Sequence, residues 1–498
     1  MPFPIRPRIF LPCLVALTLA CTAEAGPVIA PGDIGLRHEI QLLADYGVIR
    51  GPVTTWPLAW DAVESDLRRA KDEEMILPVA VERTLERLLA RAERESRRGK
   101  HRIKGRLAVA EKPTRIRGFA NTPREEAELS AGYSWFGDYL TVDLNVTGVN
   151  DPADGEDVRP DGSLVALELG NISIAASTMD RWWGPGWDGS QILSNNARPI
   201  PAFTIDRNRT DAFKTKWLSW IGPWDFSFIA GQMEKERVVP NTRFLGFRVS
   251  FKPHPAWEIG LSRTAQWCGD GRPCDFDTFW DIVWGKDNAD DGGTLEDDPS
   301  NQQAEIDIRV SNQWFGTPMA IYVSGTAQDE AGGLPSTWMG QAGIESSGYI
   351  RNRWSYRWFL EFASNSCDAL KSTVRFNCAY DHVVYETGYR YRGRVIGHGA
   401  EADARVGSAG IILTNAEATT WQFLFRAGDL NRDGLPVPRN LRNTLTPTPQ
   451  EIASADIRFG TSTHYGRIEI GIGYEEIDDA ASGIKTDDTR AYVSWTSP

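Results

Sequence analysis

Residues 179–207 bring aromatic, charged and amide side chains together in one short segment. Three tryptophans, Trp182, Trp183 and Trp187, surround a Gly-Pro-Gly kink at 184–186. Seven polar residues accompany them: Arg181, Asp188, Asn195, Asn196, Arg198, Asp206 and Arg207. Tryptophan faces can stack on the C–H faces of sugars, and the polar groups can hydrogen-bond to sugar hydroxyls. Because this mixture is costly in a dry core, we interpret the ten residues as glycan-binding candidates in a wet cavity. The alternative is a structural plug whose tryptophans only fill space.

A second pattern resembles part of a calcium-binding loop. Asp429, Asn431 and Asp433 have the spacing D-x-N-x-D-G, but the twelfth position, which needs Glu, holds Asn440. A polar turn is the alternative, and we expect no other cofactor. The acidic run between Asp287 and Asp298 could bind divalent cations that bridge anionic sugars or lipopolysaccharide, although a solvated loop explains it equally well.

The sequence gives little support to an enzyme. None of the six histidines stands in an H-E-x-x-H motif, and no G-x-S-x-G turn appears. Paired carboxylates could serve a surface glycosidase, which we keep as a remote alternative. We therefore predict a protein without catalytic residues.

The cysteines and the N-terminus indicate export. Residues 1–25 read as a signal peptide, with a basic start, a short apolar stretch and an A-x-A cleavage site before Gly26. Four cysteines remain after cleavage, in two closely spaced pairs: Cys268 with Cys274, and Cys367 with Cys378. We predict two local disulfides. The alternative, a zinc site built from all four thiolates, lacks the usual ligand spacing.

Residues 26–104 are predicted to form a small helical bundle. Apolar residues recur with a helical period in 33–49, 57–70 and 78–98, with Thr55 as the expected N-cap of the second helix. The C-terminal flank of this region is strongly basic. Either this charge favours a helix C-terminus and a solvated face, or it contacts anionic lipid headgroups or an anionic polymer.

Residues 105–498 change to a period of two and predict a transmembrane barrel of about 18 antiparallel strands. Segments of about ten residues alternate apolar and polar side chains, and no run of about 18 apolar residues follows the signal peptide. Two segments, 200–207 and 394–400, are either strands or inward excursions. Short turns are expected at one end of the barrel and long loops, with both cysteine pairs, at the other. A large soluble periplasmic β-protein is the alternative.

Four segments carry a resemblance to a known family, which covers nearly all of the mature chain. The most specific are PGDIGLRHEIQLLADYGVIRGPVTTWPL (31–58) and MDRWWGPGWDGSQILSNNARPIPAFTIDR (179–207), supported by YETGYRYRGRVIGHG (385–399) and LNRDG (430–434). The chain resembles the capsule assembly protein Wzi family. That resemblance implies an outer-membrane barrel with a periplasmic helical bundle and long loops at the cell surface. It also implies a lectin that holds capsular polysaccharide, and not an enzyme.

Together these observations predict an outer-membrane lectin that attaches capsular or other exopolysaccharide to the cell. A porin or solute channel is the alternative, because a barrel of this size can enclose an aqueous lumen. Expected partners are the polysaccharide, outer-membrane lipid and lipopolysaccharide. The formal net charge of −13 argues against nucleic acid. We expect a monomer.

Overall fold

A computed structural model describes residues 28–284, 299–314, 316–331, 334–369, 371, 373–433 and 443–498. The predicted signal peptide and the acidic run 287–298 lie outside these residues. So do Gly434 and Asn440 of the calcium-like pattern.

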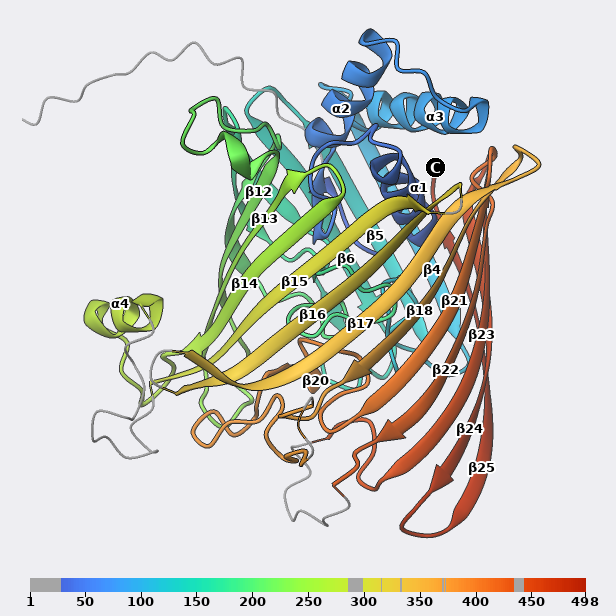
Figure 1. The fold of residues 1–498 in the computed structure, drawn as a ribbon. Helices are drawn as coiled ribbons and strands as arrows, with labels where there is room; N and C mark the ends of the chain where they lie inside the picture. The colour runs from blue at the N-terminus through green and yellow to red at the C-terminus, as the bar shows by residue number, and fades with distance from the viewer. Residues whose placement is uncertain are drawn as a thin grey trace, which may run out of the picture.

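The described residues form a closed antiparallel barrel (Figure 1). Eighteen strands make its wall: β4 (His101–Ala110), β5 (Ala127–Phe136), β6 (Leu140–Val149), β8 (Leu164–Leu169), β9 (Ile172–Ser177), β11 (Ala202–Arg207), β12 (Trp224–Gln232), β13 (Arg243–His254), β14 (Trp257–Trp267), β15 (Ser300–Trp314), β16 (Thr317–Ala331), β17 (Leu334–Ile350), β18 (Trp354–Ser364), β21 (Arg405–Asn415), β22 (Thr420–Leu430), β23 (Gln450–Thr463), β24 (Gly466–Asp479) and β25 (Ile484–Thr496). The two-residue β7 (Val158–Arg159) is a short addition beside β6. The ring closes where β25 pairs with β4. This confirms the predicted fold class.

Alternation along each strand separates a lipid-facing surface from the lumen. In β22, Phe423 and Phe425 point outward and are exposed, whereas Gln422 and Arg426 point inward and are buried. A wall of this kind places apolar side chains against lipid and polar ones inside, and pairs every strand edge with a neighbour. The same alternation was the basis of the strand prediction.

The two ambiguous segments resolve differently. Residues Ala202–Arg207 form β11, which pairs with β9 on one side and β12 on the other, so this segment belongs to the wall. Arg394–Val395 form β20, which pairs only with β19 (Arg390–Tyr391) and lies off the ring. The first wall strand begins at His101, four residues before the boundary predicted at 105.

Connections differ in length at the two ends of the barrel (Figure 1). Most turns at the helix-bearing end are short, the exception being residues 208–223, which contain the short helix η1 (Ser219–Ile221). Long connections lie at the opposite end. Both predicted disulfides form there, Cys268–Cys274 after β14 and Cys367–Cys378 after β18.

Three helices cover one mouth of the barrel: α1 (Ile34–Asp45), α2 (Trp60–Asp72) and α3 (Val79–Glu95). Nearly every residue of α1 is buried, because α3 packs on one side of it and the barrel on the other. A fourth helix, α4 (Phe276–Trp284), lies outside the wall. None of the helices in the described ranges is both long and apolar enough to span a bilayer.

The predicted start of the second helix was wrong. Thr55 does not cap a helix: Thr55–Trp56 form β2, which pairs with β10 (Trp182–Trp183), and α2 begins at Trp60 after an extended Ala59. A further pair joins β1 (Val28–Ile29) to β3 (Leu58–Ala59). Pairing with a segment more than a hundred residues away overrides the local capping pattern.

The basic flank of the bundle is largely neutralised by carboxylates. Arg102 pairs with Glu95 at 2.5 Å, Lys104 with Asp143 at 2.7 Å, and Arg98 with Asp138 at 3.3 Å. These pairs tie the end of the bundle to β4 and its neighbours.

Asp33 offers a test of how the bundle is held. Its Oδ1 accepts a hydrogen bond from the Leu36 amide at 3.0 Å, and its Oδ2 lies 3.2 Å from Arg91. Burial alone would raise the pKa of Asp33, but Arg467 and Arg91 lower it to about 2. We expect Asp33→Asn, which keeps a good cap, to lower the free energy of unfolding of the bundle by about 1–2 kcal/mol at neutral pH.

The direction in which the stability contribution of Asp33 changes with pH follows from its lowered pKa. Its contribution is present above the unfolded value near 3.8 and is lost as the pH falls toward 2. Urea unfolding followed by far-ultraviolet circular dichroism should therefore show wild type and variant converging in acid. Asp72→Asn, at the exposed end of α2, is the control. A difference between wild type and Asp33→Asn that persists at pH 2 would contradict this explanation.

Candidate functional site

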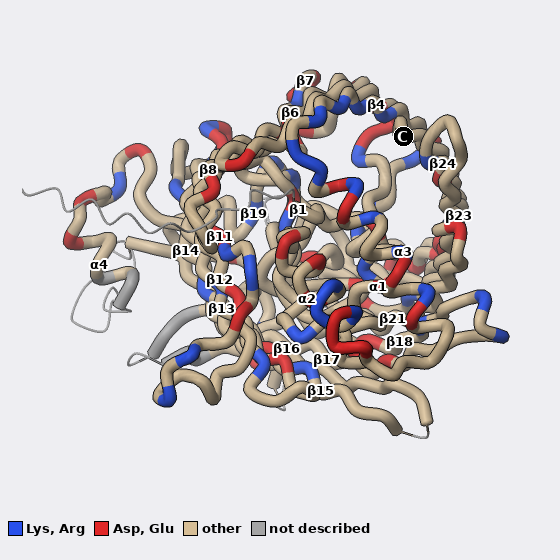
Figure 2. Tube along the Cα trace, turned by 90° about the horizontal axis from the view of Figure 1, so that it is seen from above, with Lys and Arg blue, Asp and Glu red and all other residues tan. Residues whose placement is uncertain are grey.

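The tryptophan-rich segment lies inside the barrel as a plug, here defined as residues 179–201 between β9 and β11. Viewed from the helix end, chain segments and helices lie within the ring of strands (Figure 2). Trp182 and Trp183 are 0% exposed, and Trp187 is 2% exposed. In this conformation the three ring faces contact protein, and none of them is open to a sugar.

Arg37 of α1 is the centre of the packing around two of the tryptophans. Its guanidinium carbon lies 4.2 Å from the ring centroid of Trp187, 4.3 Å from Phe119 and 5.4 Å from Trp182. It also donates a hydrogen bond to the Gly186 carbonyl at 2.7 Å. Burial lowers the pKa of Arg37 to about 9, so the side chain stays charged at neutral pH. The cation therefore joins the helical bundle to the plug through cation–π contacts.

Two glutamates on the inner wall hold the backbone and one side chain of the plug. Glu361 accepts hydrogen bonds from the backbone amides of Trp187 at 2.7 Å and Gly189 at 2.9 Å, and from the Tyr322 hydroxyl at 2.7 Å. Glu345 accepts from the Trp187 indole at 2.6 Å. The plug is thus bonded to β17 and β18, and Tyr322 on β16 holds Glu361 in place.

Glycine is required where the plug turns back on itself. Gly184 has a φ of +116°, in the region that side chains rarely adopt. A Cβ on Gly186 would collide with the carbonyl oxygen of Gly189, and one on Gly189 would collide with the His398 ring. Burial lowers the pKa of His398 to about 4, so a neutral imidazole packs at this turn.

A buried ion pair with Arg426 holds Asp188, which follows Trp187 in the plug. Both oxygens of Asp188 accept from Arg426 on β22, at 2.6 Å from Nη2 and 2.8 Å from Nε. Asp456 on β23 also contacts Arg426, at 3.3 Å. Burial alone would raise the pKa of Asp188, but the arginine lowers it below its usual value.

Trp183, Asn195 and Asn196 make contacts away from the cluster around Arg37. Trp183 belongs to a different apolar cluster from Trp182 and Trp187. The side-chain amide of Asn195 donates to the Phe119 carbonyl, and that of Asn196 to the Val395 carbonyl, each at 2.9 Å. Both asparagines therefore bind protein backbone.

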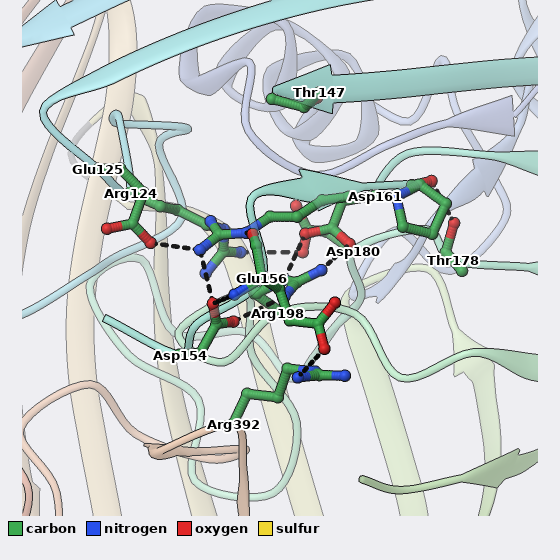
Figure 3. Close-up of polar contacts among 12 residues, drawn as sticks. Arg124, Glu125, Thr147, Asp154, Glu156, Asp161, Thr178, Asp180, Arg198 and Arg392 are labelled. Carbon is green, nitrogen blue, oxygen red and sulfur yellow. Dashed lines mark hydrogen bonds and ion pairs between the residues drawn. The ribbon is translucent and has the colours of Figure 1, made fainter. Parts of the chain in front are cut away.

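Arg198 lies at the polar edge of the plug (Figure 3). It pairs with Asp154 at 2.6 Å and with Asp161 at 2.8 Å. Arg159 joins the same network, at 2.9 Å from Asp154 and 2.6 Å from Glu125. These pairs connect the plug to the loop between β6 and β8.

A polar cleft of about 190 Å³ adjoins this network. Its polar lining residues include Asn121, Arg124, Ser130, Asn145, Thr147, Arg159, Asp161 and Asp180. Arg124 donates to Asp180 at 3.1 Å and to the Asn195 carbonyl at 2.9 Å. Guanidinium, amide, hydroxyl and carboxylate groups thus meet beside the plug.

Asp206 and Arg207 are part of the wall strand β11 and not of the plug. Asp206 lies 3.8 Å from Arg181 and accepts from the Ser227 hydroxyl at 2.6 Å. Arg207 stacks on Trp224, with 3.8 Å between the guanidinium carbon and the ring centroid. The ten predicted residues are therefore spread over the plug core, its edge and the wall.

The calcium-like pattern makes other contacts. Asp429 lies 3.4 Å from Arg405, the Asn431 amide donates to the Thr446 carbonyl at 3.1 Å, and Asp433 accepts from Asn377. Within the described ranges, no group of three or more His, Cys, Asp or Glu side chains could hold a metal ion. Because the second half of the pattern lies outside those ranges, calcium binding stays a prediction.

Sequence analysis missed the partners of the plug. These are Arg37 on α1, Glu345 on β17, Glu361 on β18 and Arg426 on β22. The three wall residues were detectable as charged residues at inward positions of alternating strands, but nothing in the local sequence connects them to the plug.

The fold and site define a plugged transmembrane β-barrel of the outer-membrane type. Residues 96–483 match the family described as capsule assembly protein Wzi. A Klebsiella pneumoniae protein, described as an uncharacterized 55.8 kDa protein in the cps region, is 31% identical over 356 residues. That similarity covers 70% of this chain and 68% of the relative. The chain belongs to the capsule assembly protein Wzi family.

A solved structure shares the whole architecture. Wzi of Escherichia coli is described as an outer membrane protein involved in group 1 capsule assembly and as a carbohydrate-binding β-barrel. It superposes with a TM-score of 0.82 at 24% identity, covering 95% of this chain and 99% of that one. The bundle and the barrel thus recur together in that structure.

The Asp188–Arg426 pair tests whether buried charge holds the plug. We expect Asp188→Ala to destabilise the plugged barrel by about 3–5 kcal/mol, because a buried guanidinium loses its main partner. The plug should loosen, and conductance in planar bilayers should rise above that of wild type.

Asp429→Ala is the matched control. Asp429 on β22 pairs with Arg405 on the neighbouring strand β21, but both side chains are partly exposed, so its loss should cost about 1 kcal/mol or less. Equal urea stability and equal conductance for the two variants would show that the buried pair does not hold the plug.

Proposed function

We propose that this protein is an outer-membrane lectin that attaches capsular or another exopolysaccharide to the cell surface. Membership of the Wzi family over most of the chain carries the proposal. The carbohydrate-binding barrel with the same fold supports it. The plug favours attachment over the porin alternative, because Trp182, Trp183 and Trp187 are buried against protein inside the barrel.

The two unlike ends of the barrel support one orientation in the membrane. In it, the helical bundle and the short turns face the periplasm, and the long connections face outward. The two disulfides, both in long connections, suit an oxidising extracytoplasmic location. The protein acts as a monomer in the outer membrane.

The sugar contacts are made by the polar cleft at the edge of the plug. Arg124 and Arg159 supply cationic donors for an acidic sugar, while Asn145 and Thr147 supply neutral groups for hydroxyls. The buried tryptophans hold the plug that forms one side of this cleft. Their direct stacking on sugar stays a prediction, against which their burial counts.

The groups around the cleft suit binding better than catalysis. Asp154, Asp161 and Asp180 each pair with an arginine, so these carboxylates already have charged partners within the protein. We therefore propose that polysaccharide is held and released without cleavage.

Filling the cleft tests this function. Thr147 points into the cleft from β6, whereas its neighbour Val146 is exposed on the lipid-facing side. We expect Thr147→Trp to move polysaccharide from cells to medium with unchanged total synthesis, because the larger ring occupies the sugar site. The measurement is the partition of native polysaccharide between the two fractions.

Val146→Trp is the matched control and should retain polysaccharide like wild type. Both variants must reach the outer membrane in equal amounts. Normal retention by a well-assembled Thr147→Trp protein would remove the cleft from the proposal, and normal retention in a strain lacking the protein would remove attachment itself.

A further inference from the structure

Helix α4 lies beside the barrel wall, outside the ring of strands (Figure 1). The Cys268–Cys274 disulfide ties the start of this excursion to the end of β14. Phe279 and Ile282 pack near Trp267 on the outward face of that strand. By contrast, Phe276 is 68% exposed and Trp280 is 42% exposed. The helix therefore presents aromatic rings at the side of the barrel, where interfacial aromatics occur in membrane proteins.

A hollow of about 990 Å³ lies between α4 and the outward face of the strands from β8 to β13. Its floor is one row of outward residues that pair across neighbouring strands: Val165, Ala176, Phe203, Ala230 and Leu245. The two alanines leave depressions between the larger side chains on the outer surface of the wall. Because this floor is part of the outward apolar surface, the groove is continuous with the lipid-facing belt.

The groove is polar at one end only. Arg243, Gln232 and Thr178 lie at the end nearest the long connections, and Phe228 lies farther along the wall toward the barrel middle. Asp275 also lines the groove, and its carboxylate accepts from the amide and hydroxyl of Thr278 at the start of α4. Arg243 points outward, is exposed and lies 5.7 Å from the Trp267 ring centroid. An amphiphile with an anionic head at Arg243 and an acyl chain over Ala230 matches this distribution.

We propose that this groove binds an acyl chain of lipopolysaccharide, with Arg243 pairing with a phosphate of its lipid A headgroup. The proposal rests on the orientation in the proposed function. In that orientation the long connections face outward, and this end of the wall lies in the outer leaflet. The groove lies outside the wall and the sugar cleft inside it, so the two sites can be tested separately.

The experiment uses the full-length protein in detergent micelles, with lipid A as the added lipid and native mass spectrometry as the readout. We expect Ala230→Trp, which fills the groove, to weaken lipid A binding about tenfold or more. Ala427→Trp is the matched control, because Ala427 is an exposed outward alanine near the same end of β22, away from α4. Its binding should equal that of wild type.

Two more arms test the headgroup and the source of the lipid. Arg243→Gln should weaken binding of lipid A several-fold but leave binding of dephosphorylated lipid A unchanged. Phosphatidylglycerol should compete poorly. If Ala230→Trp does not assemble, Phe203→Ser is the second variant. It removes the largest apolar side chain from the floor of the groove without adding bulk, and it should also weaken lipid A binding.

The outcomes separate this proposal from the proposed function. Wild-type lipid A binding by Ala230→Trp or Phe203→Ser would overturn the groove, and preferential binding of phosphatidylglycerol would overturn lipopolysaccharide as its occupant. Polysaccharide retention by the Ala230→Trp strain should stay normal. Loss of retention together with loss of lipid A binding in a well-assembled Ala230→Trp protein would argue against two separate sites.

Discussion

A closed ring of strands turns half of its side chains inward, and the interior depends on giving those polar groups partners. Outward positions must be apolar to face lipid, so charge collects inside. Arg309 on β15, Glu345 on β17 and Arg426 on β22 all point into the lumen and are nearly fully buried. A buried charge without a partner is costly, and the plug and α1 supply the partners.

The same pairs connect the helical bundle to the plug. Asp45 at the end of α1 lies 2.8 Å from Arg309 and 3.1 Å from Arg357, and both arginines also contact Glu345. Glu345 in turn accepts from the Trp187 indole. Bundle, wall and plug therefore share one network of buried charge, which explains why the tryptophans are packed within protein.

This arrangement suits a protein that holds a polymer in place. A plug bonded to the inner wall leaves its own edge, the long connections and the lipid-facing wall as surfaces for partners. The polar cleft beside Arg198 and the apolar groove beneath α4 lie on opposite sides of the wall. Sugar and lipid could thus be bound by one rigid barrel.

The barrel, a strand number of about 18, the two disulfides and the helical character of the N-terminal region could all be predicted from the sequence. Each depends on a local signal: a period of two, a helical period or a short cysteine spacing. Local signals failed where a distant pairing competed with them, as at Thr55, whose strand pairs with β10. They also left 200–207 and 394–400 unresolved, because alternation does not say whether a segment finds neighbours on both sides.

The contacts of the tryptophan-rich segment could not be predicted from its own residues. Its composition fits a wet cavity as well as a sealed plug, since both need polar partners. The difference lies in Arg37, Glu361 and Arg426, which come from elements some 150–240 residues distant in the chain. A period fixes the face on which a side chain lies, but its partner across the lumen depends on how the ring closes.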